Sequence, residues 1–219
     1  MSLTFTEENY LKAIYTLQSR SETGDVSANE IAGRLDNRPA TVTDMLRKLS
    51  EKQLIHYEKY KRVRLTETGK HTALSVVRKH RLWETFLSEK LSFDWDEVHD
   101  IAEQLEHIDS PKLIERLDEF LGFPQFDPHG DPIPDAQGKI PKSSAQLLSL
   151  APPGRWIQIV GVKDTSRAFL RQLAKDELDI GASLMVKEKL PFDHSLIIKT
   201  RAGKTIQISE KMANNLMVT

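Results

Sequence analysis

The sequence predicts a mainly α-helical protein with a winged helix-turn-helix, a helical middle segment and a small C-terminal β-barrel. Apolar residues recur with helical spacing up to about residue 122, and they alternate with strand spacing after about residue 146. A stretch dense in Gly, Pro and Asp separates the two patterns. We therefore expect three domains, at residues 1–70, 71–145 and 146–219.

The first 70 residues read as three helices followed by a hairpin. Ser27 and Glu30 form a capping-box pattern that opens a short second helix, and residues 36–39 make a tight turn before the third. This order predicts a helix-turn-helix that binds DNA, although a plain three-helix packing unit has the same pattern. The outward face of the third helix carries side chains suited to bases and phosphates: Arg38, Thr41, Thr43, Asp44, Arg47 and Lys48.

A basic hairpin follows the third helix. Its tip and second strand carry Lys59, Lys61, Arg62 and Arg64, which would approach phosphates if the hairpin forms a wing beside DNA. Taken alone, such a cluster is more typical of a solvated turn. The combination with a preceding helix-turn-helix favours the wing.

Ligand-type side chains gather on two helices of the middle segment. His80 and Glu84 lie one turn apart among apolar residues of a long helix that Thr66 can cap. A later helix, expected over residues 96–108, places four more on one stripe: His99, Glu103, Glu106 and His107. Imidazoles and carboxylates are the ligands of a borderline or hard divalent cation. The alternatives are a solvated face, or an Arg that pairs with the buried carboxylate.

The helix that starts at Ser110-Pro111 adds more apolar surface than a small monomer would hide. The sequence therefore predicts a homodimer, and a two-fold dimer would match palindromic double-stranded DNA. The Gly/Pro/Asp-rich loop that follows contains His129 between Asp127 and Asp131, which we interpret as a polar turn.

The last segment alternates like a set of short strands around one helix. Residues 155–160, 182–186, 196–199 and 205–208 have strand character, and residues 166–178 read as a helix. About 70 residues of this kind fit a small β-barrel.

Composition excludes several classes of protein. The 31 Lys and Arg nearly balance the 32 Asp and Glu among 219 residues, so any DNA-binding surface must be local. No cysteine is present, which excludes disulfides, zinc fingers and a thiol nucleophile. The sequence contains no apolar run of about 20 residues and no signal-peptide pattern, so we expect a cytoplasmic protein without a membrane span.

Taken together, these motifs resemble the DtxR/MntR family of metal-dependent transcriptional repressors. The resemblance rests on the winged helix, the segments His80-Arg-Leu-Trp-Glu84 and Glu103-Gln-Leu-Glu106-His107, the loop over residues 127–134, and a C-terminal segment similar to an SH3-like (FeoA-type) domain. It implies a repressor of metal-homeostasis genes that Mn(II) or Fe(II) activates, not an enzyme. In such repressors, metal joins the first helix to the ligand helix.

The resemblance also implies two metal sites. The primary site would comprise Asn9, Glu103, Glu106 and His107, and the second would comprise His80, Glu84 and His99. Asp164 of the C-terminal domain is either a further ligand of the second site or a cap of the helix that starts near Ser166. Asn9 and Lys12 depart from the family pattern, and a cation at Lys12 argues against a closely spaced metal pair. A set of oxygen and imidazole donors suits Mn(II) or Fe(II), and other divalent transition metals would bind in vitro.

Three other functions remain compatible with parts of the sequence. A metallohydrolase could use the His/Glu cluster, but no nucleophile or H-E-x-x-H helix is present. A winged-helix regulator could sense an organic ligand, with the His and Glu residues structural. A protein-interaction module is suggested only by the C-terminal segment.

Overall fold

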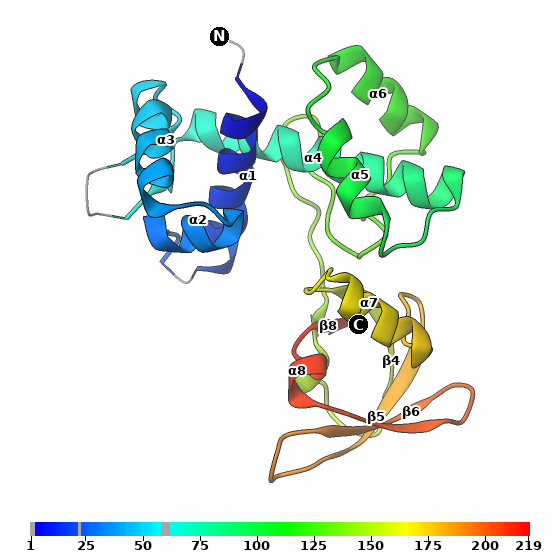
Figure 1. Ribbon diagram of the computed structural model, residues 1–219. Coiled ribbons are helices and arrows are strands. Elements are labelled where there is room, and N and C mark those ends of the chain that lie inside the picture. The colour runs from blue at the N-terminus through cyan, green and yellow to red at the C-terminus, as the bar shows by residue number, and fades with distance from the viewer. Residues whose placement is uncertain (1–2, 22, 58–61) are drawn as a thin grey trace. The chain divides into compact units, whose positions relative to one another are not determined.

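The computed structural model describes residues 3–21, 23–57 and 62–219 (Figure 1). The chain forms two compact units. Unit 1 comprises Met1–His80, Glu103–Ile114 and Pro134–Ile140, and unit 2 comprises Arg81–Ala102, Glu115–Ile133 and Pro141–Thr219. Each unit is described by itself below. No helix in the described part of the chain is long and apolar enough to cross a membrane.

Unit 1 begins with three helices around a common core. Helices α1 (Phe5–Arg20), α2 (Ala28–Leu35) and α3 (Pro39–Glu51) bury Leu11, Ile14, Ile31, Leu46 and Leu49 completely. Their starts are set by local chemistry, because Thr4 and Ser27 each form a capping box with the glutamate three residues later. The helix-turn-helix and its capping box at Ser27 are therefore confirmed.

The turn between α2 and α3 is tight because Asp36 adopts the left-handed conformation, with φ of 50°. Arg38 then occupies the N-cap position of α3 and Pro39 its first turn, where a missing N–H does no harm. This arrangement leaves the Arg38 side chain exposed at the start of α3.

A two-stranded antiparallel sheet follows α3. Strands β1 (Ile55–His56) and β2 (Arg64–Leu65) pair Ile55 with Leu65. Side-chain contacts hold the hairpin against the rest of the unit. Arg64 forms an ion pair with the Asp25 carboxylate and donates a hydrogen bond to the Thr23 carbonyl at 3.0 Å. Lys59 and Lys61, predicted at the tip, lie outside the described residues.

Helix α4 (Glu67–Leu91) runs through both units, and Thr66 caps its first turn by accepting from the Gly69 N–H at 3.0 Å. Helix α5 (Val98–Leu105) is shorter than predicted. It ends at Leu105, where the chain turns and the Ile108 N–H donates to the Leu105 carbonyl at 3.1 Å, and Ser110-Pro111 then opens α6 (Pro111–Phe120). Glu106 and His107 therefore lie in the turn after α5. The prediction that four ligand-type residues share one helical stripe was wrong.

The C-terminal part of unit 2 is an antiparallel sheet of six strands in the order β3-β8-β4-β5-β6-β7. The strands are β3 (Gln146–Leu147), β4 (Trp156–Val162), β5 (Ser183–Lys189), β6 (Leu196–Thr200), β7 (Thr205–Ile208) and β8 (Leu216–Val218). A short 3-10 turn, η1 (Leu148–Leu150), and the helices α7 (Arg167–Lys175) and α8 (Glu210–Ala213) connect them.

This sheet is not closed into a barrel within the described residues, contrary to the prediction. Strands β3 and β7 are its two edges, and β3 contributes only two paired residues. The apolar face is covered instead by α7, whose Leu170 and Leu173 are fully buried in one core with Ile159, Leu184 and Ile198 of the sheet.

Candidate metal centre and DNA-binding surface

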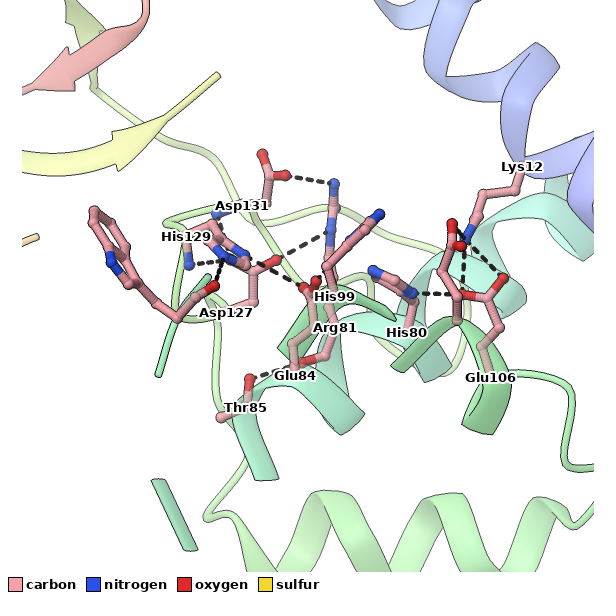
Figure 2. Close-up of polar contacts among 12 residues, drawn as sticks. Lys12, His80, Arg81, Glu84, Thr85, His99, Glu106, Asp127, His129 and Asp131 are labelled. Atoms are coloured by element: carbon pink, nitrogen blue, oxygen red, sulfur yellow. Dashed lines mark hydrogen bonds and ion pairs between the residues drawn. The ribbon is translucent and has the colours of Figure 1, made fainter. Parts of the chain in front are cut away.

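Glu106 is the centre of a buried polar cluster in unit 1. Its side chain is completely shielded from solvent, yet it faces positive or polar groups on two sides (Figure 2). Lys12 of α1 places its Nζ 2.7 Å from Oε1 and 2.8 Å from Oε2, and His80 of α4 places Nδ1 2.5 Å from Oε2. Three segments far apart in the sequence therefore meet at one carboxylate.

The charge state of Glu106 follows from these contacts. Burial raises the pKa of its carboxyl, but the hydrogen bond with His80 and the charge of Lys12 outweigh burial and hold the pKa below its ordinary value. Glu106 is therefore ionised at neutral pH. A buried anion of this kind is stable only beside a cation, which is the environment that a metal ligand needs.

His107 is held in one orientation by two residues of α1. Its Nδ1 lies 2.6 Å from Oε2 of Glu8, and its ring stacks on Phe5 with a centroid separation of 4.7 Å. Its Nε2 faces Glu106, 3.7 Å from Oε1. A carboxylate that accepts from one ring nitrogen leaves the other nitrogen free to bind a metal, as in carboxylate–histidine–metal arrangements.

The other predicted members of the primary site are more exposed. Glu103 is half-exposed and lies 3.5 Å from Lys12 Nζ. Asn9 is exposed on α1, between Glu8 and Lys12. Glu8 and Lys12 are one helical turn apart, so both reach the ligand turn from the same side of α1. The sequence analysis missed Glu8, whose spacing to Lys12 could have indicated it.

A second cluster surrounds the buried Glu84 in unit 2. His99 Nδ1 lies 3.1 Å from its Oε1, and His129 Nδ1 lies 3.6 Å from its Oε2. Glu84, Asp127 and His129 each offer one ligand atom within 4.8 Å of the others, and all three are buried. His80 precedes Glu84 by one turn of α4 and, within unit 1, contacts Glu106.

The loop that carries His129 has a defined, hydrogen-bonded conformation. Asp127 accepts from the backbone N–H groups of His129 and Asp131 at 2.8 and 2.9 Å. Gly130 has a φ of 82°, and a Cβ there would meet the Val160 carbonyl oxygen at 2.0 Å. His129 Nε2 lies 2.7 Å from the Trp95 carbonyl oxygen, so it donates and leaves Nδ1 toward Glu84. Interpreting residues 127–131 as only a polar turn was therefore incomplete.

Burial and neighbouring charge shift two groups of this cluster. Burial together with the charge of Glu84 raises the pKa of Asp127 to about 7. For His129, burial lowers the pKa, but the hydrogen bond and charge of Glu84 outweigh it and raise the pKa overall. The guanidinium of Arg81, 3.6 Å from Oδ2 of Asp127 and 3.4 Å from Oδ2 of Asp131, partly offsets the negative charge of this cluster.

Asp164 lies in unit 2, in the turn between β4 and α7. Its Oδ1 accepts from the Ser166 N–H at 2.9 Å, and Ser166 is the N-cap residue of α7. Asp164 therefore orders the turn before the helix.

The described residues that were predicted to contact DNA lie at the start of α3, along α3 and in the hairpin. Arg38, Thr41, Asp44 and Arg47 are exposed, and Asp44 pairs loosely with Arg47 at 3.5 Å. Thr43 is half-buried and donates its hydroxyl to the Pro39 carbonyl at 3.0 Å. Arg62, at the base of the hairpin, donates to the Asp25 carbonyl at 3.4 Å.

Comparison with known proteins gives matches along almost the whole chain. Three family profiles match: "Iron dependent repressor, N-terminal DNA binding domain" at residues 2–63, "Iron dependent repressor, metal binding and dimerisation domain" at 66–135, and the FeoA domain at 146–219. The chain is similar to the iron-dependent repressor IdeR of Mycobacterium leprae, with 30% identity over 93% of this chain and 88% of that protein.

Two further similarities agree with these profiles. The diphtheria toxin repressor of Corynebacterium glutamicum is 28% identical over 97% of this chain and 95% of its own length. A solved manganese-dependent transcriptional repressor in complex with manganese has a TM-score of 0.88 and 36% identity, covering 97% of this chain and 99% of that one.

The fold and these matches define a metal-dependent, DNA-binding transcriptional repressor, not an enzyme. The helical segments that hold Glu106 and Glu84 fall within the matched metal-binding and dimerisation domain. The chain belongs to the DtxR/MntR family of iron- and manganese-dependent repressors.

Proposed function

We propose that this repressor responds to Mn(II), which Glu103, Glu106 and His107 bind together with Asn9. The supporting observation is the donor set around the buried Glu106, which contains carboxylate oxygen and imidazole nitrogen and no sulfur. Oxygen-rich sets suit Mn(II), and the manganese complex of a similar repressor agrees with this assignment. Fe(II) fits the same donors, and later transition metals would bind in vitro at least as tightly.

The protein's own residues would couple this site to DNA binding through α1. Phe5 and Glu8 in its first turns contact His107, and Lys12 contacts Glu106. The same helix also contributes to the core that it shares with α2 and α3, through Tyr10, Leu11 and Ile14. A divalent cation supplies charge that draws the surrounding donors together. A ligand that binds the DNA-competent arrangement better increases its population.

We propose a second metal site at Glu84. Glu84, Asp127 and His129 support it by their mutual distances, and His99 by its contact with Glu84. The family resemblance adds His80 and Asp164 as candidate ligands. If Asp164 is a ligand, Asp164→Asn weakens the second binding step in a metal titration. If it only orders the turn before α7, the titration is unchanged, because Asn accepts the Ser166 N–H equally well.

We further propose that a cytoplasmic homodimer binds a palindromic operator. Arg38, Thr41, Thr43 and Asp44 would face bases in the major groove, while phosphates would contact Arg47 and the hairpin residues Lys59, Lys61 and Arg62. The exposed apolar side chains Leu113 and Phe120 of α6 support dimerisation. We assign the C-terminal sheet to the SH3-like type, which the FeoA match supports.

An anaerobic DNA-binding titration tests the proposal. Duplexes from the protein's own promoter region are titrated with Mn(II) or with chelator present. We expect tight binding only with Mn(II), and loss of the response in His107→Ala, with the fold checked by circular dichroism. Equal affinity with chelator would contradict metal activation. A metal response retained in His107→Ala would contradict the assigned ligands. Leu74→Ile, a conservative change of a buried core residue, is the folded control.

A further inference from the structure

Lys12 introduces a fixed positive charge into the proposed primary site. Its ammonium contacts both oxygens of Glu106, at 2.7 and 2.8 Å, and lies 3.5 Å from Glu103 (Figure 2). Two of the three strongest candidate ligands are therefore already paired with a cation of the chain itself. A metal and an ammonium ion repel each other when they share a carboxylate.

The burial of Glu106 explains why a cation is needed there. A fully buried carboxylate without a counter-charge would destabilise the fold or bind a proton. The positive or polar side chains that face Glu106 come from three elements: Lys12 from α1, His80 from α4, and His107 from the same turn. Of these, only Lys12 carries a charge that does not depend on histidine protonation.

The Lys12 side chain also has a route out of the site. It is 17% exposed, whereas Glu106 is 0% exposed. Its stem is flexible, so the ammonium can withdraw toward solvent while the helix stays in place. Glu106, by contrast, cannot exchange its partner for water.

We infer that Lys12 is a resident counter-cation that competes with the metal for Glu106. It stabilises the metal-free protein and weakens metal binding, so that the repressor responds in a higher range of metal concentration. This inference rests on the proposed function, because it takes Glu106 to be a metal ligand. It makes Lys12 an affinity-setting residue that need not bind the metal itself.

The test is a Mn(II) titration of Lys12→Met in the full-length protein, with a competing fluorescent indicator. Removing a unit charge that contacts the ligand carboxylates should tighten Mn(II) binding about tenfold or more, equivalent to about 1.4 kcal/mol. The thermal midpoint of the metal-free protein should fall at the same time, because Glu106 loses its counter-charge. Lys12→Gln, which removes the charge but can donate to Glu106, replaces Lys12→Met if that variant does not fold.

Two controls separate charge from position. Lys12→Arg keeps the charge and should keep the affinity of the wild type. Lys79→Met removes a lysine that is similarly shielded but lies 3.9 Å from Glu8, so its effect on affinity should be smaller than that of Lys12→Met. Unchanged or weaker Mn(II) binding in Lys12→Met, or in Lys12→Gln where it replaces that variant, would overturn the inference. Absence of Mn(II) binding by the wild type would instead overturn the proposed function.

Discussion

Replacing Glu8 with alanine should weaken metal binding although Glu8 is not among the proposed ligands. The carboxylate accepts from His107 Nδ1 at 2.6 Å, which is short even for a hydrogen bond with an ionised partner. Such bonds contribute about 1.5–3 kcal/mol, and part of the orientation remains because Phe5 still stacks on the ring. We therefore expect a loss of about 10- to 100-fold in Mn(II) affinity, the range found when carboxylates behind ligating histidines are removed.

Isothermal titration calorimetry under anaerobic conditions measures this loss directly. Glu8→Gln is the matched variant, because its amide oxygen can still accept from Nδ1 and should recover most of the affinity. Urea unfolding of the metal-free variants checks that the helices remain intact. Wild-type affinity in Glu8→Ala would refute the reasoning, since His107 would then need no support from α1. Equal losses in Glu8→Ala and Glu8→Gln would argue for the charge of Glu8 rather than for its hydrogen bond.

Three further predictions address other parts of the chain. Glu7→Gln should lower the free energy of unfolding by about 1–2 kcal/mol at pH 7, because it breaks the 2.6 Å pair with Lys52. Burial raises the pKa of Glu7, but the contact with Lys52 and the hydrogen bonds with Thr4 outweigh burial and hold the pKa below its ordinary value. This stability is therefore fully present above the ordinary pKa and is lost as the pH falls through the lowered pKa, so urea unfolding across pH should show the two curves converging at acidic pH. Arg47→Ala should reduce the slope of log K against log salt concentration for DNA binding by about 0.9 for all sequences, whereas Arg38→Ala should alter the preference at one base pair. Gel shifts on operator variants at several salt concentrations distinguish the two effects. Gly130→Ala should displace the loop from β4 and abolish the second step of a metal titration while sparing the first, and an unaltered second step would show that the loop position is unimportant.

Local patterns predicted the helices and their starts well. The capping box at Ser27 and the tight turn at Asp36 before α3 depend on neighbouring residues, so the sequence contains the necessary information. The end of α5 was harder to predict, because the periodicity of apolar residues continues to Ile108 while the backbone already turns after Leu105. Sheet closure depends on pairing between strands far apart in sequence, which periodicity does not report.

The candidate site was predicted as a list of residue types but not as a geometry. Glu106 and His107 stood out because both ligand types occur side by side. Their partners, Lys12 and Glu8, lie more than 90 positions away, and only folding brings them together. His129 was underestimated for the same reason, since its burial comes from the docking of its loop against β4.

The complete burial of Glu106 has a consequence for how fast the repressor can respond. Solvent has no direct access to this carboxylate, so a metal ion reaches it only through a transient opening in which the Lys12 ammonium withdraws toward solvent. The time course of switching should then follow the frequency of this opening and not the intrinsic rate at which water leaves a metal ion. A change in metal concentration that lasts less than the interval between openings would then leave the DNA binding of the repressor unchanged.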